Sequence, residues 1–532
     1  MRKIKKMLAL VIAMVMIVGT MSTAVFADDG DLTVDAKVTV TGLESGDTVT
    51  AYQFVTWTPN VGWTLASGLK KLAADGTLSN DDMTIDDITD GLTKDELAAL
   101  GKQTDKMTAV TGQLAADGKS WEYTCGTVET AGSYLILATA NDAQHVYNPA
   151  VVSADFSEDS ASTVALLTSD TATVKKQNVT LDKEVDNDPD DYSVQVGDIV
   201  PFTVTVTVPQ YNKNWTEPYF AVSDVLSNGL TLQTVPTVTG LTAGTDYEIT
   251  DKGTVGSNGF TIKFKESYLK DNASAAVTIT YSALVGEAVK DTAQIHEETN
   301  KVTLTFSNNP QNSEDHKTID DETHHYTFAI DASRFGSGSG STNELIKVGV
   351  DSAGNTITTI QEGESWATGV APLAGAEFTL TGPANSQGEA YSQSATSDEN
   401  GRIFFNNLEV GTYTLTETKA PAGYIKDNTS HTVEISANFD DDGVLLDYTV
   451  TVDGNKTNKG HDAYSATTDA ATSSTSDITA SADNTKFPIG NTKGVELPST
   501  GGMGTTLFYI IGAVLVLGAG ILLVTRRRMS AN

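Results

Sequence analysis

Cysteine and histidine, the side chains most often used for nucleophilic catalysis and zinc binding, are few in this 532-residue sequence, with one Cys and seven His. Cys125 is the only cysteine, which excludes an intramolecular disulfide; with no adjacent histidine, it is expected to be a plain strand residue rather than a nucleophile. His316, His324 and His325 lack the carboxylate pattern that supports a zinc site, so we expect linker residues. The sequence has no phosphate-binding glycine loop and no Ser/His/Asp arrangement. A hydrolase is therefore the weakest interpretation, and we predict that the protein is not an enzyme.

Two acidic runs, residues 186–191 and 440–443, could offer the oxygen ligands that calcium prefers. Neither run has the spacing of a dedicated calcium loop. We predict no metal and no cofactor, and calcium binding stays open as an alternative.

Both ends of the chain have the composition of export and membrane segments. Basic residues at 2–6 precede the short apolar run Met7–Val18, and Val25-Phe26-Ala27 suits a signal peptidase. We therefore predict a signal peptide over 1–27. At the other end, Leu507–Val524 is long enough to span a bilayer, and Arg526–Arg528 should stay cytoplasmic.

A pentapeptide, Leu497-Pro498-Ser499-Thr500-Gly501, lies just before this span. The pentapeptide, apolar helix and basic tail together resemble the LPxTG cell-wall sorting signal, here 496–532. The resemblance implies that a sortase cysteine cleaves between Thr500 and Gly501. It also implies that the enzyme holds the Thr500 carbonyl as a thioester until an amine takes it, which anchors the chain to peptidoglycan at the cell surface.

The processed part of the chain is strongly acidic. Of the 34 Lys and Arg, four lie in the signal and three in the tail, so 27 remain against 69 Asp and Glu. The resulting net charge of about −42 repels nucleic acid and anionic lipid, so neither is a predicted partner.

Between the ends, alternating β-branched runs predict half-buried strands, for example Phe202–Val208 and Tyr413–Thr416. The length suggests three mainly-β sandwich domains in a row, which we place at 28–174, 175–325 and 326–495. Polar stretches at 171–176 and 310–325 are taken as the joints. Thr93 followed by Lys94–Leu100 predicts one short helix in the first domain.

The last domain carries the most specific internal motif. Tyr413–Tyr424 closely resembles the E-box of pilin and Cna-B-type adhesin domains, Leu345–Val348 resembles the first strand, and Phe487–Asn491 resembles the last. The resemblance implies a Cna-B-like, immunoglobulin-type sandwich in which Lys347 and Asn491 join autocatalytically as an isopeptide bond assisted by Glu417.

Burial explains why these residue types suit that reaction. Desolvation removes the charge of a lysine amine and protonates a glutamate. The neutral amine can attack the amide, while the protonated acid stabilises the tetrahedral intermediate and shuttles a proton so that ammonia leaves.

The middle domain has a second set. Val179–Val185 resembles the opening strand of the fimbrial isopeptide-forming D2 domain, Tyr219–Leu230 its acidic strand and Lys301–Pro310 its closing strand. The likeness implies that Lys183 joins an asparagine with Asp224 shuttling protons. Alternation with Leu304 and Phe306 favours Asn308 over Asn309 as that partner.

The first domain resembles the N-terminal domain of shaft pilins, which present an acceptor lysine after it. This chain lacks the usual Tyr-Pro-Lys context and reads Val174-Lys175-Lys176-Gln177-Asn178. We favour Lys176 as acceptor and keep Lys175 open.

The combined resemblance predicts a sortase-assembled shaft pilin, joined covalently to other pilin subunits and anchored to the wall, that supports adhesion. The alternative is a single wall-anchored adhesin or ancillary pilin that binds a host surface ligand; such a protein does not need the acceptor lysine. Three domains without an inserted binding module favour the shaft.

Overall fold

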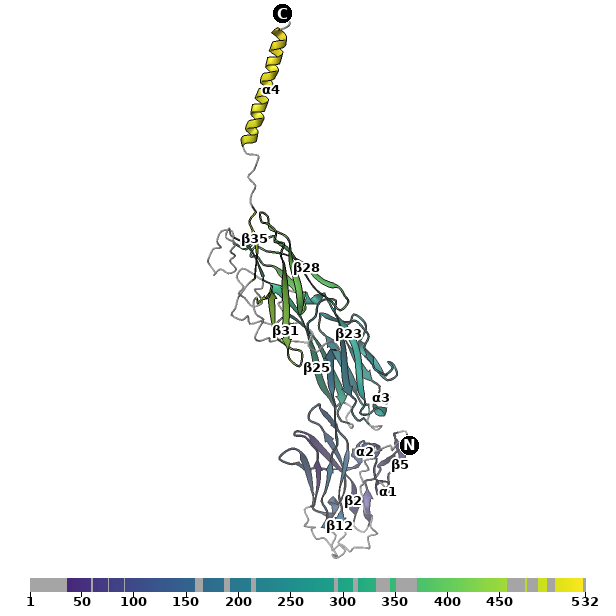
Figure 1. Cartoon of the computed structure of the whole chain (residues 1–532). Coiled ribbons are helices and arrows are strands. Elements are labelled where there is room, and N and C mark those ends of the chain that lie inside the picture. The colour runs from purple at the N-terminus through teal and green to yellow at the C-terminus, as the bar shows by residue number, and fades with distance from the viewer. Residues whose placement is uncertain are drawn as a thin grey trace, which may run out of the picture.

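The computed structural model describes residues 36–58, 61–74, 76–89, 91–157, 166–185, 192–211, 217–290, 295–309, 314–331, 345–350, 371–456, 474–475, 487–494 and 503–529. Three β-rich domains follow one another along the molecule, and the helix α4 (Met503–Met529) projects beyond the last of them (Figure 1). The predicted row of β-sandwiches is confirmed.

The first domain packs two sheets against each other, with Val38, Trp121 and Tyr134 in the core between them. One sheet has the order β14 (Asp170–Thr173), β1 (Ala36–Thr41), β8 (Ser120–Cys125), β7 (Gln113–Leu114). The other has the order β11 (Ala150–Ala154), β9 (Gly132–Thr139), β2 (Thr48–Thr58), β3 (Gly62–Leu65), with β6 (Thr108–Val110) also on β2. Two short pairs join β4 (Lys70–Leu72) to β5 (Leu78–Asp82) and β12 (Phe156–Ser157) to β13 (Leu166–Leu167).

The predicted helix of the first domain is α2 (Lys94–Gly101), which follows the short helix α1 (Ile85–Thr89). Thr93 caps α2 because its hydroxyl accepts from the Glu96 amide while the Glu96 carboxylate accepts from the Thr93 amide. Cys125 lies buried in β8, as expected of a plain strand residue.

The middle domain is a sandwich of two sheets. The first has the order β16 (Leu181–Val185), β17 (Ile199–Thr207), β23 (Ala276–Val285), β19 (Leu230–Leu232), with β20 (Thr237–Val238) also on β23. The second has the order β21 (Tyr247–Lys252), β22 (Gly259–Phe264), β18 (Phe220–Leu226), β24 (Ile295–Ser307), β25 (His316–Asp331), β29 (Phe404–Leu408), with β34 (Ser474–Thr475) on β24. A short helix, α3 (Glu266–Asp271), follows β22.

The C-terminal domain consists of one large sheet and, facing it, a two-stranded pair. The sheet has the order β28 (Ala390–Thr396), β27 (Glu377–Ala384), β30 (Gly411–Lys419), β31 (Ser430–Phe439), β32 (Leu445–Val452), β33 (Asn455–Lys456). The first and last strands of the domain, β26 (Leu345–Val350) and β35 (Phe487–Thr492), run parallel beside each other.

The domain joints are more structured than the polar composition of residues 310–325 predicts. Strand β25 runs straight through the expected boundary at residue 325, because its first part pairs with β24 and its last part with β29. Direct hydrogen bonds reinforce this joint, including Val196 N to Asn407 Oδ1 and Ser386 N to Asp198 Oδ1, both 2.7 Å. The prediction of a linker over 310–325 is therefore wrong from His316 onward.

The joint between the first and middle domains is a β-ribbon. Strand β10 (His145–Tyr147) pairs antiparallel with β15 (Lys176–Asn178), and Val146 packs into the core of the middle domain. The expected boundary at 174 lies just before β15, the second strand of this ribbon.

Candidate functional site

Lys347 and Asn491 are positioned by the parallel pair of first and last strands in the C-terminal domain. Lys347 lies opposite Ile489 and Asn491 opposite Gly349, two residues farther along, so both side chains fall on one face of the pair. Glu417 comes from β30 in the facing sheet, where it lies opposite Phe378 of β27. The interior of the sandwich thus receives all three polar side chains.

These three side chains form one buried cluster. Lys347 Nζ lies 2.9 Å from Glu417 Oε1, and Asn491 Nδ2 donates to Glu417 Oε2 at 2.9 Å. The Asp427 amide also donates to Glu417 Oε2, at 2.6 Å. The side chains of Lys347 and Glu417 are 0% and 1% exposed. The structure therefore brings together the lysine, acid and amide that the E-box resemblance implies.

The surroundings favour a neutral, reactive amine. Burial lowers the pKa of Lys347, although Glu417 opposes that shift, and the Phe378 ring lies 5.3 Å from Nζ. The contact between Lys347 Nζ and Glu417 Oε1 is close, but its geometry is not that of a good hydrogen bond. Asn491 Oδ1 also has no hydrogen-bond partner among the described residues. Buried donors and acceptors without a good hydrogen bond lower the stability of the folded domain until they gain a better partner.

A second buried cluster joins the two sheets of the middle domain. Lys183 of β16 and Tyr281 of β23 come from one sheet, and Asp224 of β18 and Asn300 of β24 come from the other. Lys183 Nζ lies 2.7 Å from Asp224 Oδ2, which also accepts from the Tyr281 hydroxyl at 2.7 Å. Asn300 Nδ2 in turn donates to the Tyr281 hydroxyl at 2.9 Å.

Burial sets the electrostatics of this second cluster. Both side chains of the Lys183–Asp224 pair are 0% exposed. Desolvation lowers the pKa of Lys183 and raises the pKa of Asp224, each against the opposing charge of the other. Burial and the nearby Lys183 also lower the pKa of His325 to about 3, so this histidine is neutral. Both members of the pair are thereby driven toward the neutral forms that amide attack requires.

Asn308, the predicted partner of Lys183, does not lie in this cluster. Asp224 faces Val302 across the sheet, and Asn308 is six residues farther on, about 20 Å at the rise of a strand. Its amide instead donates to the Ala140 carbonyl of the first domain at 3.4 Å. Asn308 is buried, but the asparagine of this cluster is Asn300, which is connected to Asp224 through the Tyr281 hydroxyl. The structure therefore does not bring the predicted Asn308 together with Lys183 and Asp224.

Lys176, the expected acceptor, lies on β15 at the joint of the first two domains. Its side chain is 39% exposed and forms an ion pair with Glu44 of the first domain. The hydrogen bond from Lys176 holds the pKa of Glu44 below its usual range. Lys175 is exposed as well. Both lysines are accessible, and Lys176 is the one held by a specific contact.

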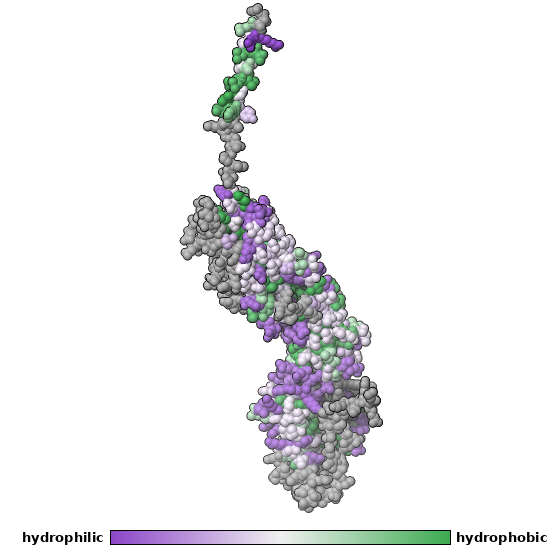
Figure 2. Space-filling model, viewed as in Figure 1, coloured by the Kyte–Doolittle hydropathy of each residue, from purple (hydrophilic) through white to green (hydrophobic). Residues whose placement is uncertain are grey.

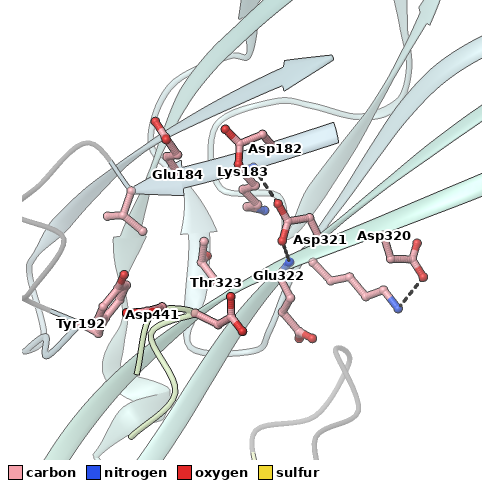
Figure 3. Close-up of a pocket in the computed structure, with 12 residues that line it drawn as sticks. Asp182, Lys183, Glu184, Tyr192, Asp320, Asp321, Glu322, Thr323 and Asp441 are labelled. Carbon is pink, nitrogen blue, oxygen red and sulfur yellow. Dashed lines mark hydrogen bonds and ion pairs between the residues drawn. The ribbon is translucent and has the colours of Figure 1, made fainter. Parts of the chain in front are cut away.

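An acidic pocket of about 770 Å³ opens between the middle and C-terminal domains beside β16 (Figure 3). Its walls include Asp182, Glu184, Asp321, Glu322 and Asp441. The backbone amides of Lys183 and Glu322 donate to Asp321 here, at 2.8 and 2.9 Å, and Lys301 Nζ lies 3.1 Å from Asp320 Oδ2. In the described part of the chain, no group of three or more His, Cys, Asp or Glu is arranged to hold a metal. The acidic run 186–191 lies outside the described residues.

The terminal segments are described only in part. Thr500, Gly501 and the predicted signal peptide 1–27 lie outside the described residues. Helix α4 contains the expected span Leu507–Val524, and Arg526, Arg527 and Arg528 fall in its last turn. The space-filling view shows this helix as hydrophobic over most of its length, with a hydrophilic cluster near its far end (Figure 2).

Three family models match separate parts of the chain. Residues 196–310 match the Cna-B-like domain of Gram-positive pilin backbone subunit 2, and residues 366–459 match a prealbumin-like fold domain. Residues 491–530 match the LPXTG cell wall anchor motif.

Known relatives align with nearly the whole chain. The trypsin-resistant surface T6 protein of Streptococcus pyogenes is 25% identical, over 97% of this chain and 99% of that protein. The solved T6 backbone pilin of that organism, a modular three-domain structure, matches with a TM-score of 0.55 at 21% identity, covering 88% of this chain and 99% of that one. The major pilin SpaD of Corynebacterium diphtheriae matches at a TM-score of 0.45 and 16% identity, over 88% and 99% of the two chains. The T6 likeness shows a shared fold.

Proposed function

We propose that this chain, a homologue of the Gram-positive backbone pilins that carries their LPXTG wall anchor, is the repeating shaft subunit of a covalently polymerised pilus. The observation that carries this proposal is the alignment with the T6 surface protein, which extends over 97% of this chain and 99% of that protein. The chain is anchored covalently to the cell wall at the surface, and sortase is the enzyme that we propose acts on it.

We propose that each of the two buried clusters forms an isopeptide bond. In the C-terminal domain Lys347 Nζ attacks Cγ of Asn491, the Cγ–Nδ2 bond breaks, and the nitrogen leaves as ammonia. Glu417 gives its proton to the leaving nitrogen and takes one from Nζ, so the acid is regenerated. Its position supports this role, because one carboxyl contacts both the amine and the amide.

In the middle domain the proposed bond joins Lys183 to Asn300, with Asp224 as the acid. The two bonds would close loops of about 140 and about 120 residues, and loop closure of that size stabilises a domain by about 5 kcal/mol. A shaft subunit under load gains more than stability, since the links keep the first and last strands of a sandwich from separating.

The intact mass of the processed chain, residues 28–500, tests these bonds. We expect a mass about 34 Da below that of the sequence, because each bond expels one ammonia of about 17 Da. The Asn300→Ala variant should lose one bond, so its mass deficit should fall to about 17 Da.

The matched control is Asn308→Ala, which removes a buried asparagine just after the end of the same strand. That variant should keep the full deficit. A full deficit in Asn300→Ala together with a reduced one in Asn308→Ala would contradict the assignment of Asn300.

Between subunits, we propose that the sortase-held Thr500 carbonyl of one chain is transferred to the Lys176 amine of the next. Attack on the thioester needs an uncharged, accessible amine. Lys176 is supported by its exposure at the joint of the first two domains. The buried lysines 183 and 347 cannot reach an enzyme active site.

A further inference from the structure

The acids of the two clusters reach their amides in different ways. Glu417 accepts directly from the Asn491 amide at 2.9 Å. Asp224 has a side chain one methylene shorter, and the hydrogen bond of the Asn300 amide goes to the Tyr281 hydroxyl instead. That hydroxyl donates to the same Asp224 oxygen that contacts Lys183. The tyrosine thus occupies the gap that the longer glutamate spans in the other domain.

We infer that Tyr281 is a catalytic residue of the middle domain, a proton relay between Asp224 and the departing nitrogen of Asn300. This inference rests on the proposed Lys183–Asn300 bond. Three consecutive contacts of 2.7, 2.7 and 2.9 Å connect the amine, the acid, the hydroxyl and the amide. A hydroxyl suits this place because it donates one proton while accepting another.

The step balances without any further reactant. Lys183 Nζ bonds to Cγ of Asn300, and Tyr281 passes its hydroxyl proton to Nδ2 as the Cγ–Nδ2 bond breaks. Asp224 re-protonates Tyr281, and then takes the surplus proton from Nζ. Ammonia leaves, and both the tyrosine and the acid return to their starting states.

The environment keeps the relay intact. Tyr281 is buried in the core, with 5% of its surface exposed, and burial with the adjacent Asp224 raises its pKa well above the ordinary value. The hydroxyl therefore keeps its proton for transfer. The ring also stacks on Phe202 at 5.2 Å, which fixes its orientation.

The test is the Tyr281→Phe variant of residues 28–500, which removes the hydroxyl and keeps the ring. General acid–base transfer contributes typically 10²–10⁴-fold. We expect the middle bond to form at least tenfold more slowly, so that freshly purified protein shows a deficit near 17 Da, the C-terminal bond being complete. Incubation followed by intact-mass measurement gives the rate.

Tyr211→Phe is the matched control. Tyr211 is equally buried in the same domain, but its hydroxyl donates to the Tyr219 and Ser307 carbonyls, away from the cluster. It should keep the full deficit of about 34 Da, equal to two ammonia molecules.

The remaining outcomes separate the two proposals. A full deficit in both the wild type and Tyr281→Phe overturns the relay and leaves the bond standing. An equal delay in Tyr211→Phe also overturns the relay, because loosening of the core would explain both. A wild type lacking only about 17 Da, with Lys347 and Asn491 joined, overturns the Lys183–Asn300 bond and the relay with it.

Discussion

Replacing Glu417 by alanine should reduce the mass deficit of the processed chain, relative to the mass calculated from the variant's own sequence, from about 34 to about 17 Da, and strongly destabilise the C-terminal domain. Without the acid, neither proton transfer can occur, and Lys347 stays a buried amine without its charge partner. Loss of the cross-link alone removes about 5 kcal/mol. The expected result is a separate unfolding transition of the C-terminal domain at a markedly lower temperature. Calorimetry measures this transition, and the intact mass is measured on the same sample.

Glu434→Ala provides the control, since Glu434 is exposed on the neighbouring strand β31. It should keep both bonds and melt within a degree or two of the wild type, as surface changes usually do. An unchanged mass deficit of about 34 Da in Glu417→Ala would remove Glu417 from the reaction, whatever happens to the melting temperature.

Lys176→Arg should abolish polymer growth in cells that carry the cognate sortase. Arginine keeps the positive charge opposite Glu44 but is a poor nucleophile, because its guanidinium stays protonated. On a denaturing gel of wall extracts, the high-mass ladder should collapse to a single anchored species. Anchoring itself should persist, because Thr500 can still be passed to peptidoglycan.

Lys175→Arg is the matched control one residue away, and its ladder should remain. If the ladder is lost only in Lys175→Arg, then Lys175 is the acceptor and Lys176 is not. A ladder that survives the double substitution would exclude the ribbon β10–β15 as the acceptor site.

Sequence patterns located the C-terminal cluster because its three residues lie in motifs with fixed places in the fold. Lys347 and Asn491 come from the first and last strands, and the E-box contains Glu417. The structure places all three within contact. The parallel pairing that aligns the two strands follows from the fold and has no local signal.

The middle cluster shows which property of a residue cannot be predicted from the alternation of inward and outward side chains along a strand. Period-two alternation predicts which face a residue occupies, and both Asn300 in β24 and Asn308, just after the end of β24, are buried. It does not give the position along the strand, which depends on the register with β18. Tyr281 was missed for a related reason, since a tyrosine on a buried strand face looks like ordinary core until its hydroxyl is seen between Asp224 and Asn300.

The prediction of a linker failed at β25 because polar side chains of this strand are paired across the sheet. His324 Nδ1 lies 2.7 Å from Glu297, and the Tyr326 hydroxyl donates to the same carboxylate at 3.0 Å. Such internal partners allow a polar sequence to run buried between two domains, where hydrophobicity predicts an exposed linker.

The most direct measurement of polymer assembly is tandem mass spectrometry of peptides from the high-mass species in wall extracts. A shaft subunit predicts a branched peptide in which the carbonyl of Thr500 is joined to the side-chain amine of Lys176. Trypsin should fail to cleave after that lysine, because its amine is acylated. If Thr500 is recovered only on peptidoglycan fragments, and Lys176 only as a free, cleavable residue, the protein is a singly anchored surface protein and not a shaft subunit.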